Sequence, residues 1–217
     1  MSAVSNEGAR NRILSRVRRA GAMGPGAAAR LAEAGQQTAP VPTQSKTSGE
    51  EAIAQFMAKA EAADATASRI PSLDALPEAL AAELRNRNLP AAIRTGGDTT
   101  FDRDWGTVER TVGVGRLEEP ATLSRAEFGV AETGTLVFAS GPDNPVTLTF
   151  LGETHFAVVN AEDVRGSFEG MWAGWRQRSL DPRTTNLVTG PSRSGDIGQV
   201  LQLGAHGPVS LHIFVVG

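Results

Sequence analysis

The sequence predicts an α/β fold in which a layered, mostly parallel sheet is flanked by helices. From Ser48 onward, helical and strand-like patterns alternate, an order typical of parallel strands joined by right-handed crossovers. Leu136–Ala139 and His155–Val159 are short apolar runs of the kind found in strands buried on both faces. A last apolar run, Val209–Val216, predicts a strand that ties the final residues into the sheet.

Composition limits the function classes that need to be considered. The 217 residues, 40% of them hydrophobic, suit one medium domain with an N-terminal appendage. With no cysteine and three histidines, the chain is not expected to hold a disulfide, a catalytic thiol, an iron–sulfur cluster, a metal or another cofactor. A net charge of −3 gives no reason to expect nucleic-acid binding. No apolar run could span a bilayer and no signal peptide is visible, so a cytoplasmic protein is expected.

The chain begins with a basic helical pattern at Arg10–Arg19. Ile13, Leu14 and Val17 fall on one face of this helix, with arginines around them. Such a helix would dock on its own domain or on a neighbour, or serve as an arm for an acidic partner; a transit peptide is a third interpretation.

A linker is expected between this helix and the main domain. Ala27–Ala34 could form two helical turns, whereas Gln36–Lys46 has almost no apolar anchor and is interpreted as a linker or mobile loop. The predicted domain boundaries are therefore 1–47 for the basic helix and flexible linker, and 48–217 for the α/β domain.

The first half of the domain shows the order helix, strand, helix, strand. A capping box at Ser48–Glu51, in which the serine side chain accepts from the Glu51 N–H, opens an amphipathic helix. The apolar positions of this helix are Ile53, Phe56, Met57 and Ala60. The elements predicted next are a strand at Thr66–Ile70, a helix starting near Pro77 with a Leu80 and Leu84 stripe, and strands at Leu89–Ile93 and Val108–Val114. The acids Asp98, Asp102 and Asp104 are interpreted as a solvated loop rather than a cation site.

The second half contains the strongest helical stripe. Glu118–Arg125 is predicted to form a short helix, and Thr147–Phe150 fits a strand or a helical turn. Asn160 is a good N-cap for a helix whose stripe is Val164, Phe168, Met171, Trp172 and Trp175. At helical spacing this stripe favours core packing over an aromatic ligand box. A strand at Asn186–Val188 and a helix starting at Ser194 or Gly195 follow.

Three glycine-rich turns hold the candidate site. Thr189–Asp196 would join a strand to a helix N-terminus, whose free N–H groups favour phosphate or carboxylate; a tight connection in which Ser194 or Asp196 only caps explains the same pattern. Glu132 could be a base, a nucleophile, a hydrogen-bond acceptor or a solvated turn residue. His206 could act in acid–base chemistry or bind an anion, whereas His155 and His212 lie in apolar runs typical of structural histidines. The candidate ligand-binding residues are Glu132, Thr133, Gly134, Thr135, Gly190, Pro191, Ser192, Arg193, Ser194, Asp196, His206 and Gly207, and the candidate catalytic residues are Glu132 and His206.

Four motifs together resemble a known family. G-V-A-E-T-G-T-L-V, T-H-F-A-V-V, T-G-P-S-R-S-G-D-I and G-A-H-G-P match, in order and spacing, the LUD domain of the lactate utilization protein C (LutC/YkgG) family, most clearly over Val108–Val216. The resemblance implies a fold like the sugar-phosphate isomerase and CoA-transferase (NagB/RpiA-like) group. It also implies membership of a three-protein bacterial system that oxidises L-lactate to pyruvate, in which two iron–sulfur proteins are the partners. The family gives this subunit no settled catalytic role.

Three functions are compatible with these patterns. The first is a non-catalytic or regulatory subunit of the lactate-oxidising system that binds a small anionic ligand; a homo-oligomer is compatible with it. The second is an acyl-transfer enzyme, because A-E-T-G at Ala131–Gly134 distantly resembles the glutamate-bearing S-E-N-G turn of CoA transferases, with Glu132 as the nucleophile. The third is a stand-alone ligand sensor.

Overall fold

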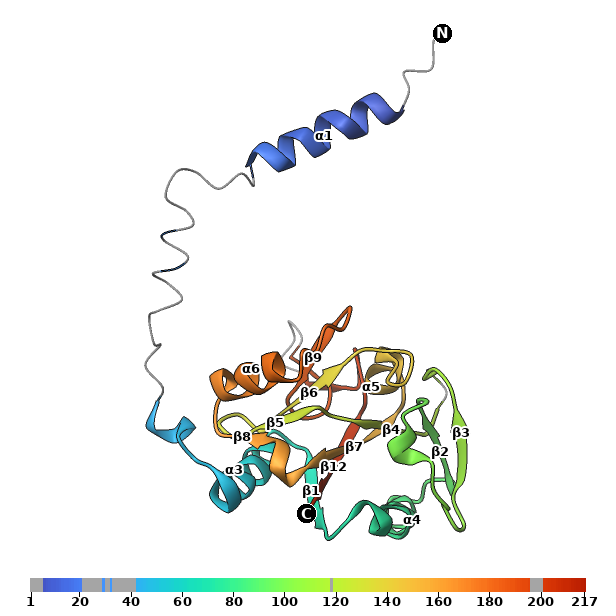
Figure 1. The fold of residues 1–217 in the computed structure, drawn as a ribbon. Coiled ribbons are helices and arrows are strands. Elements are labelled where there is room, and N and C mark those ends of the chain that lie inside the picture. The colour runs from blue at the N-terminus through green and yellow to red at the C-terminus, as the bar shows by residue number, and fades with distance from the viewer. Residues whose placement is uncertain (1–5, 21–28, 30–31, 33–41, 118, 196–200) are drawn as a thin grey trace. The chain divides into compact units, whose positions relative to one another are not determined.

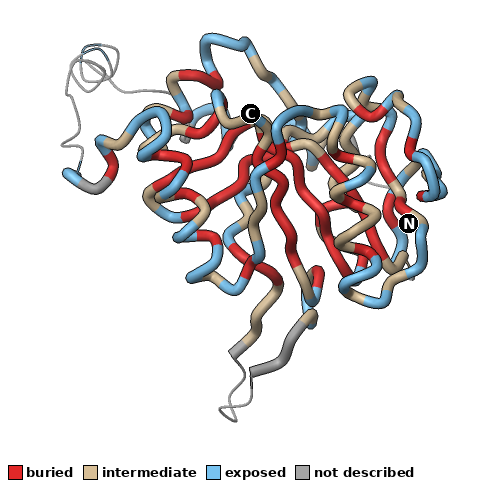
Figure 2. Tube along the Cα trace, turned by 90° about the horizontal axis from the view of Figure 1, so that it is seen from below, coloured by how far each residue is buried: buried red, intermediate tan, exposed pale blue. Residues whose placement is uncertain are grey.

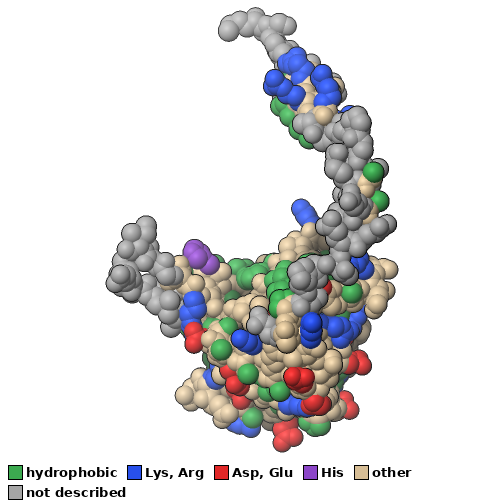
Figure 3. All heavy atoms as spheres, turned by 90° about the vertical axis from the view of Figure 1, so that its left-hand side faces the viewer, with side chains coloured by type: hydrophobic (Ala, Val, Ile, Leu, Met, Phe, Trp, Pro, Cys, Tyr) green, Lys and Arg blue, Asp and Glu red, His purple; other side chains and the backbone are tan. Residues whose placement is uncertain are grey.

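The chain divides into two compact units, Met1–Pro40 and Val41–Gly217. The computed structural model describes residues 6–20, 29, 32, 42–117, 119–195 and 201–217. In the first unit, α1 (Asn6–Ala20) confirms the predicted basic helix. Ile13 and Val17 are exposed on it, and arginine side chains are distributed along it (Figure 3). The helical turns predicted at Ala27–Ala34 lie almost entirely outside the described residues.

A parallel sheet forms the centre of the second unit (Figure 1). Its six described strands lie in the order β1-β12-β7-β4-β2-β3, and each neighbouring pair runs parallel. The strands are β1 (Thr66–Ile70), β2 (Ala92–Thr95), β3 (Glu109–Val112), β4 (Ala121–Arg125), β7 (Thr154–Asn160) and β12 (Ser210–Val216). The predicted α/β fold with a mostly parallel sheet is thereby confirmed.

A second, four-stranded sheet is mixed and has the order β8-β5-β6-β9. Its strands are β8 (Val164–Arg165), β5 (Phe128–Val130), β6 (Thr135–Ala139) and β9 (Thr185–Val188). β5 pairs parallel with β8, whereas β6 pairs antiparallel with both β5 and β9. A separate antiparallel hairpin consists of β10 (Arg193–Gly195) and β11 (Leu201–Leu203).

The two sheets and the helices pack in layers. The helices are α3 (Gly49–Ala62), α4 (Leu76–Asn86), α5 (Val146–Phe150) and α6 (Phe168–Gln177), with short 3-10 turns η1 (Thr43–Ser45), η2 (Leu73–Ala75), η3 (Thr99–Phe101) and η4 (Ala161–Asp163). α4 packs on one face of the parallel sheet, and α3 together with the second sheet packs on the other. α6 covers the outer face of the second sheet. The buried residues are concentrated along the central strands (Figure 2).

Alternation along β7 shows how the sequence specifies these layers. Phe156 and Val158 point to the α4 layer, whereas Ala157 and Val159 point to the layer of α3 and the second sheet. Because successive side chains of a strand face opposite sides, an uninterrupted apolar run fits only a strand covered on both faces. Each fully buried Phe or Leu contributes about 1.5–3 kcal/mol.

Most first-half predictions are confirmed. β1 has the predicted bounds, α4 has Pro77 in its first turn, and β3 lies within the predicted strand. β2 begins at Ala92, so the predicted strand at Leu89–Ile93 overlaps it only at its end. Ser48 is the N-cap of α3, but its side chain makes no capping bond, so the predicted capping box is wrong. Gly49, with a φ of 54°, departs from helical geometry between Ser48 and the regular turn.

Three helix predictions are wrong. Residues 121–125, predicted as part of a helix, form β4, in which Thr122 and Ser124 are buried as fully as their apolar neighbours. Asn160 precedes η4 rather than a long helix, and Ser167 caps α6 by accepting from the Gly170 N–H at 3.1 Å. At Ser194 and Gly195 the chain forms β10 of the hairpin instead of a helix. The ambiguous stretch at 147–150 belongs to α5.

None of the helices in the described part of the chain is long and apolar enough to cross a bilayer.

Candidate functional site

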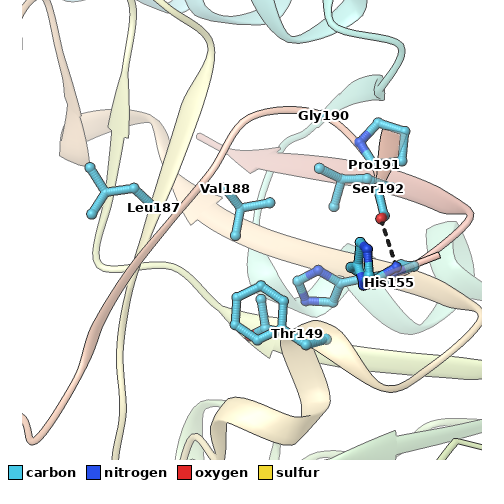
Figure 4. Close-up of a pocket in the computed structure, with 12 residues that line it drawn as sticks. Thr149, His155, Leu187, Val188, Gly190, Pro191 and Ser192 are labelled. Atoms are coloured by element: carbon cyan, nitrogen blue, oxygen red, sulfur yellow. Dashed lines mark hydrogen bonds between the residues drawn. The ribbon is translucent and has the colours of Figure 1, made fainter. Parts of the chain in front are cut away.

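A small cavity lies where two of the glycine-rich turns meet. It has a volume of about 180 Å³ and lies beside the amino ends of β7 and β12, next to β9 and the end of α5 (Figure 4). Its lining residues are Thr149, Phe150, His155, Leu187, Val188, Gly190, Pro191, Ser192, His206, Gly207, Pro208 and Leu211. Five of the candidate residues proposed from the sequence therefore line the same cavity. They are Gly190, Pro191, Ser192, His206 and Gly207.

Hydrogen bonds through Ser192 hold the two turns together. The Ser192 N–H donates to the Pro208 carbonyl at 2.8 Å, and the Gly204 N–H donates to the Ser192 carbonyl at 3.1 Å. The His206 N–H donates to the Ser192 Oγ at 3.3 Å (Figure 4, dashed line). Gly190 has a φ of 69°, and a Cβ there would lie 1.9 Å from the Ala63 carbonyl oxygen, so the turn needs glycine.

His155 is a cavity residue that sequence reasoning assigned to structure alone. Its side chain is 1% exposed, and its Nε2 lies 2.7 Å from the Ser124 Oγ, whereas its Nδ1 has no hydrogen-bond partner in the described residues. Burial lowers the pKa of His155 to about 3, so the imidazole is neutral at neutral pH. The apolar run around His155 predicts a buried strand, but it does not show that the side chain lines a cavity or that one ring nitrogen lacks a partner.

The exposed His206 separates this cavity from a second one. The second cavity, of about 470 Å³, shares Phe150, His206 and Gly207 with the first. Its other lining residues are Leu117, Leu151, Gly152, Glu153, Gly204, Ala205 and Val209. Within the turn at 204–208, His206 and Gly207 therefore line both cavities.

Arg193 lies apart from the cavity lining. Its Nε donates to the Asp64 Oδ2 at 3.1 Å, and its Nη1 is buried without a partner among the described residues. Ser194 belongs to β10, and Asp196 lies outside the described residues. The anion argument based on a helix N-terminus does not hold here, because no helix begins at Ser194 or Gly195.

The turn containing Glu132 is tied to other elements. The Glu132 Oε1 accepts from the Phe168 N–H at 2.8 Å, and its Oε2 accepts from the Ser45 hydroxyl. Ser45 is 4% exposed within η1, so this turn, at the end of the stretch interpreted as a linker or mobile loop, is anchored on the domain. Both carboxylate oxygens are thus engaged in joining η1 to the start of α6, and Glu132 lines neither cavity.

Hydrogen bonds link the threonines of the same turn to Thr189, next to the cavity wall. The Thr133 and Thr135 hydroxyl oxygens are 2.6 Å apart, and the Thr135 and Thr189 hydroxyl oxygens are also 2.6 Å apart. Thr189 directly precedes Gly190 of the cavity wall. Gly134, with a φ of 70°, packs so closely on α3 that a Cβ would lie 2.3 Å from the Ala60 nitrogen. This turn is therefore connected to the cavity wall through Thr189 and packs on α3 through Gly134.

His212 has a structural environment. Its Nδ1 lies 2.7 Å from the Thr66 Oγ1 and its Nε2 3.0 Å from the Ser68 Oγ, so both ring nitrogens have partners. Burial is the main cause that lowers the pKa of His212 to about 4; the nearby Glu83 raises it and Arg87 lowers it. Among the described residues, no group of three or more His, Asp or Glu side chains is placed to hold a metal ion.

Several known proteins are similar in sequence to part of this chain. Lactate utilization protein C of Bacillus licheniformis is 30% identical over 118 residues, covering 52% of this chain and 49% of the relative. The Bacillus subtilis (strain 168) protein of the same name is 32% identical over 98 residues, covering 43% and 41%. An uncharacterized protein of Neisseria meningitidis serogroup B is 34% identical over 97 residues, covering 44% and 42%. The chain thus spans about half the length, or less, of these relatives.

A solved structure shows the same fold, and a family model covers the chain. The crystal structure of a DUF162 family protein from Deinococcus radiodurans superposes with a TM-score of 0.60 at 19% identity, covering 79% of this chain and 99% of that one. The LUD domain model matches residues 2–216, nearly the entire sequence. The four motifs and this match together establish that the chain belongs to the LUD domain family.

Proposed function

We propose that this chain is a subunit of a bacterial system that oxidises L-lactate to pyruvate, acting with iron–sulfur partner proteins. The observation that carries the proposal is the LUD domain match over residues 2–216, together with relatives named lactate utilization protein C. Because the chain has no cysteine, cysteine-ligated clusters that accept the electrons from lactate would have to be supplied by partner proteins.

The subunit binds a small anionic ligand in the cavity between the turns at 190–192 and 206–207. A concave, mostly apolar space with a few convergent polar groups is the usual form of a small-molecule site. Here the polar side chains among the lining residues are those of Thr149, His155, Ser192 and His206. Among the described residues that line the cavity there is no Asp, Glu, Lys or Arg, which favours a monoanion over a multiply charged phosphate.

A binding role is favoured over acyl transfer because of the position of Glu132. A nucleophilic carboxylate needs an oxygen that faces the substrate. Both oxygens of Glu132 instead accept hydrogen bonds from Ser45 and Phe168. Incubation with an acyl-CoA should therefore leave the mass of the peptide containing Glu132 unchanged, and a trapped CoA thioester on it would favour the transferase.

Deletion of the gene in the source organism tests the pathway. Growth on L-lactate as sole carbon source is expected to fail while growth on pyruvate is retained, and the intact gene should restore growth on L-lactate. The tagged protein should co-purify with iron-containing proteins. Normal growth of the deletion strain on L-lactate would rule the pathway out.

Paired variants test the location of the ligand. Calorimetric titration with L-lactate and with pyruvate should detect binding that weakens in Ser192→Ala, because this change removes a cavity hydroxyl and the acceptor for the His206 N–H. Arg193→Ala should weaken anion binding only if the ligand extends to the Arg193 guanidinium. Loss of affinity in Arg193→Ala with none in Ser192→Ala would place the ligand outside the cavity.

A further inference from the structure

The outer edge of the parallel sheet carries exposed apolar side chains. β3 is the last strand in the order of that sheet, and no described strand pairs with its outer side (Figure 1). Val112 on β3 is 57% exposed, and Val114 and Leu117, just after it, are 56% and 79% exposed. Three of the eight large hydrophobic side chains exposed in the described part of the chain therefore lie within this one stretch. Single exposed apolar residues are normal on a surface, whereas a group of them marks an interaction site.

The backbone of β3 presents unused hydrogen-bonding groups along the same edge. The N–H groups of Glu109 and Gly113 donate toward β2, to the carbonyls at positions 91 and 95, at 2.8 and 2.9 Å. Alternate residues of a parallel strand bond to the same neighbour, so Arg110 and Val112 direct their N–H and C=O groups to the outer side. No described strand pairs with these groups. An unpaired row of this kind is a template for a further strand.

The devices that usually protect a sheet edge are weak on β3. Such devices include proline, charged side chains along the strand and a covering segment. The strand, Glu-Arg-Thr-Val, has no proline. The Arg110 side chain is turned toward its own domain, because its Nε donates to the Thr95 Oγ1 at 2.9 Å and its Nη1 lies 3.0 Å from the Asp102 Oδ1. At the opposite edge of the sheet, the exposed residues of β1 are the polar Thr66 and Arg69.

A second copy of the same edge complements it. In an antiparallel pair, the residues that exchange both hydrogen bonds lie opposite each other, so an outward residue must face an outward residue. Val112 placed opposite Val112 of the second copy meets this condition about a two-fold axis, and Arg110 then lies opposite Val114 on both sides. In this register the exposed valines of the two copies become cross-strand neighbours on one face of the joined sheets.

Charge and burial favour this register. Glu109 lies opposite Gly115 of the second copy and next to its Arg116, and both charged residues are exposed. No two like charges face each other, which would be destabilising. A shift of the register by two residues would instead place Val114 opposite Val108, which is 4% exposed and packs in the core of the α4 layer.

We propose that β3 is the interface of a homodimer, in which two copies of this chain join their parallel sheets through an antiparallel β3–β3 pair centred on Val112. The occupant of this edge is a second copy, because one strand supplies both the outward backbone groups and the apolar side chains that a two-fold interface needs on each side. The contact is small, so the dimer dissociates on dilution. The inference is independent of the ligand and the pathway proposed above.

Analytical ultracentrifugation of the full chain over a range of concentrations tests the interface. The wild-type protein should change from monomer to dimer as its concentration rises. Val112→Lys sets like charges face to face on the two-fold axis and should weaken dimerisation at least tenfold. Val17→Lys is the matched control, because Val17 on α1 is 62% exposed and the change in side chain and charge is the same. The control should dimerise as the wild type does.

Cysteine cross-linking tests the register. The chain has no cysteine, so each variant carries a single thiol. Opposed residues that exchange both hydrogen bonds have Cα atoms about 5.5 Å apart, a separation that a disulfide spans, so Val112→Cys should form a linked dimer on mild oxidation. In Val114→Cys the two positions lie about 14 Å apart along the paired strands, and no link should form. These variants decide the matter if Val112→Lys does not fold.

Four outcomes would overturn the inference. They are a wild-type chain that is monomeric at every concentration, which would leave the edge to a different protein, a dimer that persists unchanged in folded Val112→Lys, a dimer lost in Val17→Lys, and linkage of Val114→Cys that is as fast as that of Val112→Cys. Loss of the dimer in Val112→Lys alone, with linkage through Val112→Cys, is the expected result.

Discussion

Buried and half-buried polar side chains are the residues that distinguish this protein from a generic layered α/β core. Glu132 and His212 each have their polar atoms paired within the protein, and they join separate elements. His155 is paired at Nε2 only. Since buried polar groups are nearly always paired, this difference separates structural residues from a candidate for ligand recognition.

Removing the Glu132 carboxylate should destabilise the fold. In Glu132→Ala the Ser45 hydroxyl and the Phe168 N–H both lose their acceptor, and we expect a loss of about 1–3 kcal/mol in the free energy of unfolding. Glu132→Gln retains an acceptor for Phe168 and should lose less. Urea unfolding measures both, with the exposed Glu162→Ala as the matched control. Wild-type stability in Glu132→Ala would show that the carboxylate has no structural role.

Two buried histidines should make stability depend on pH. The pKa of His155 is lowered to about 3 and that of His212 to about 4, below the usual value of 6.5, chiefly because burial disfavours the charged ring. Below pH 6.5 the unfolded chain therefore binds more protons than the folded one. The stabilisation by neutral histidine is complete above pH 6.5 and falls as the pH drops toward 4, by on the order of 1 kcal/mol per histidine per pH unit.

Urea unfolding between pH 7 and pH 5 checks this expectation. His155→Phe combined with Ser124→Ala should reduce the slope of stability against pH by about half, because one of the two buried histidines is removed. A free energy of unfolding that does not change between pH 7 and pH 5 would contradict the burial argument.

At the scale of elements, hydrophobic periodicity predicted the helices and strands whose positions are determined by buried apolar residues. α4, β1 and β7 follow from such patterns. β4 was missed although residues 121–124 alternate apolar and polar side chains, because a run this short also fits a helical turn. For the candidate site, the glycine turns were visible in the sequence, whereas the position of His155 beside them depends on long-range strand pairing.

The hairpin of β10 and β11 shows a second limit of sequence patterns. Ser194 and Gly195 have the composition of a helix start, but here the chain pairs Arg193–Gly195 with Leu201–Leu203. N-cap residues are also common in turns, so tertiary context decides between the two. Residues 196–200, which follow the predicted helix start, lie outside the described residues.

The two tryptophans of α6 should contribute unequally. Trp175 is 7% exposed, packs near Phe128 and donates from Nε1 to the Leu180 carbonyl at 3.0 Å, whereas Trp172 is 36% exposed. Trp175→Ala should lower the free energy of unfolding by about 3–5 kcal/mol because it leaves a cavity under α6. Trp172→Ala should cost about 1 kcal/mol or less. Similar losses of the free energy of unfolding in the two variants, measured by urea unfolding, would contradict this difference. They would agree instead with the sequence-based prediction that both tryptophans pack in the core.

At the scale of the whole molecule, charge is distributed unevenly along the chain. Residues 1–40 contain six arginines and two glutamates, a net charge of +4, which leaves −7 on residues 41–217 of the total of −3. The break between the two compact units falls at Pro40 and Val41, ahead of the boundary at 47 expected from composition. A segment poor in apolar residues can still be anchored by one buried hydroxyl, and composition does not show this.

Two truncations decide where the folded domain begins. A chain starting at Pro42 keeps η1 and should unfold in urea within about 0.5 kcal/mol of the full chain, if the first unit contributes little to the second. A chain starting at Ser48 removes the buried Ser45, whose hydroxyl donates to Glu132, and the Thr47 hydroxyl, which donates to the Gln55 Oε1 at 2.6 Å. We expect it to lose about 1–3 kcal/mol. Ser45→Ala in the full chain isolates the single hydroxyl and should account for part of this loss. Equal stability of the two truncated chains would return the boundary to residue 47 and make η1 dispensable.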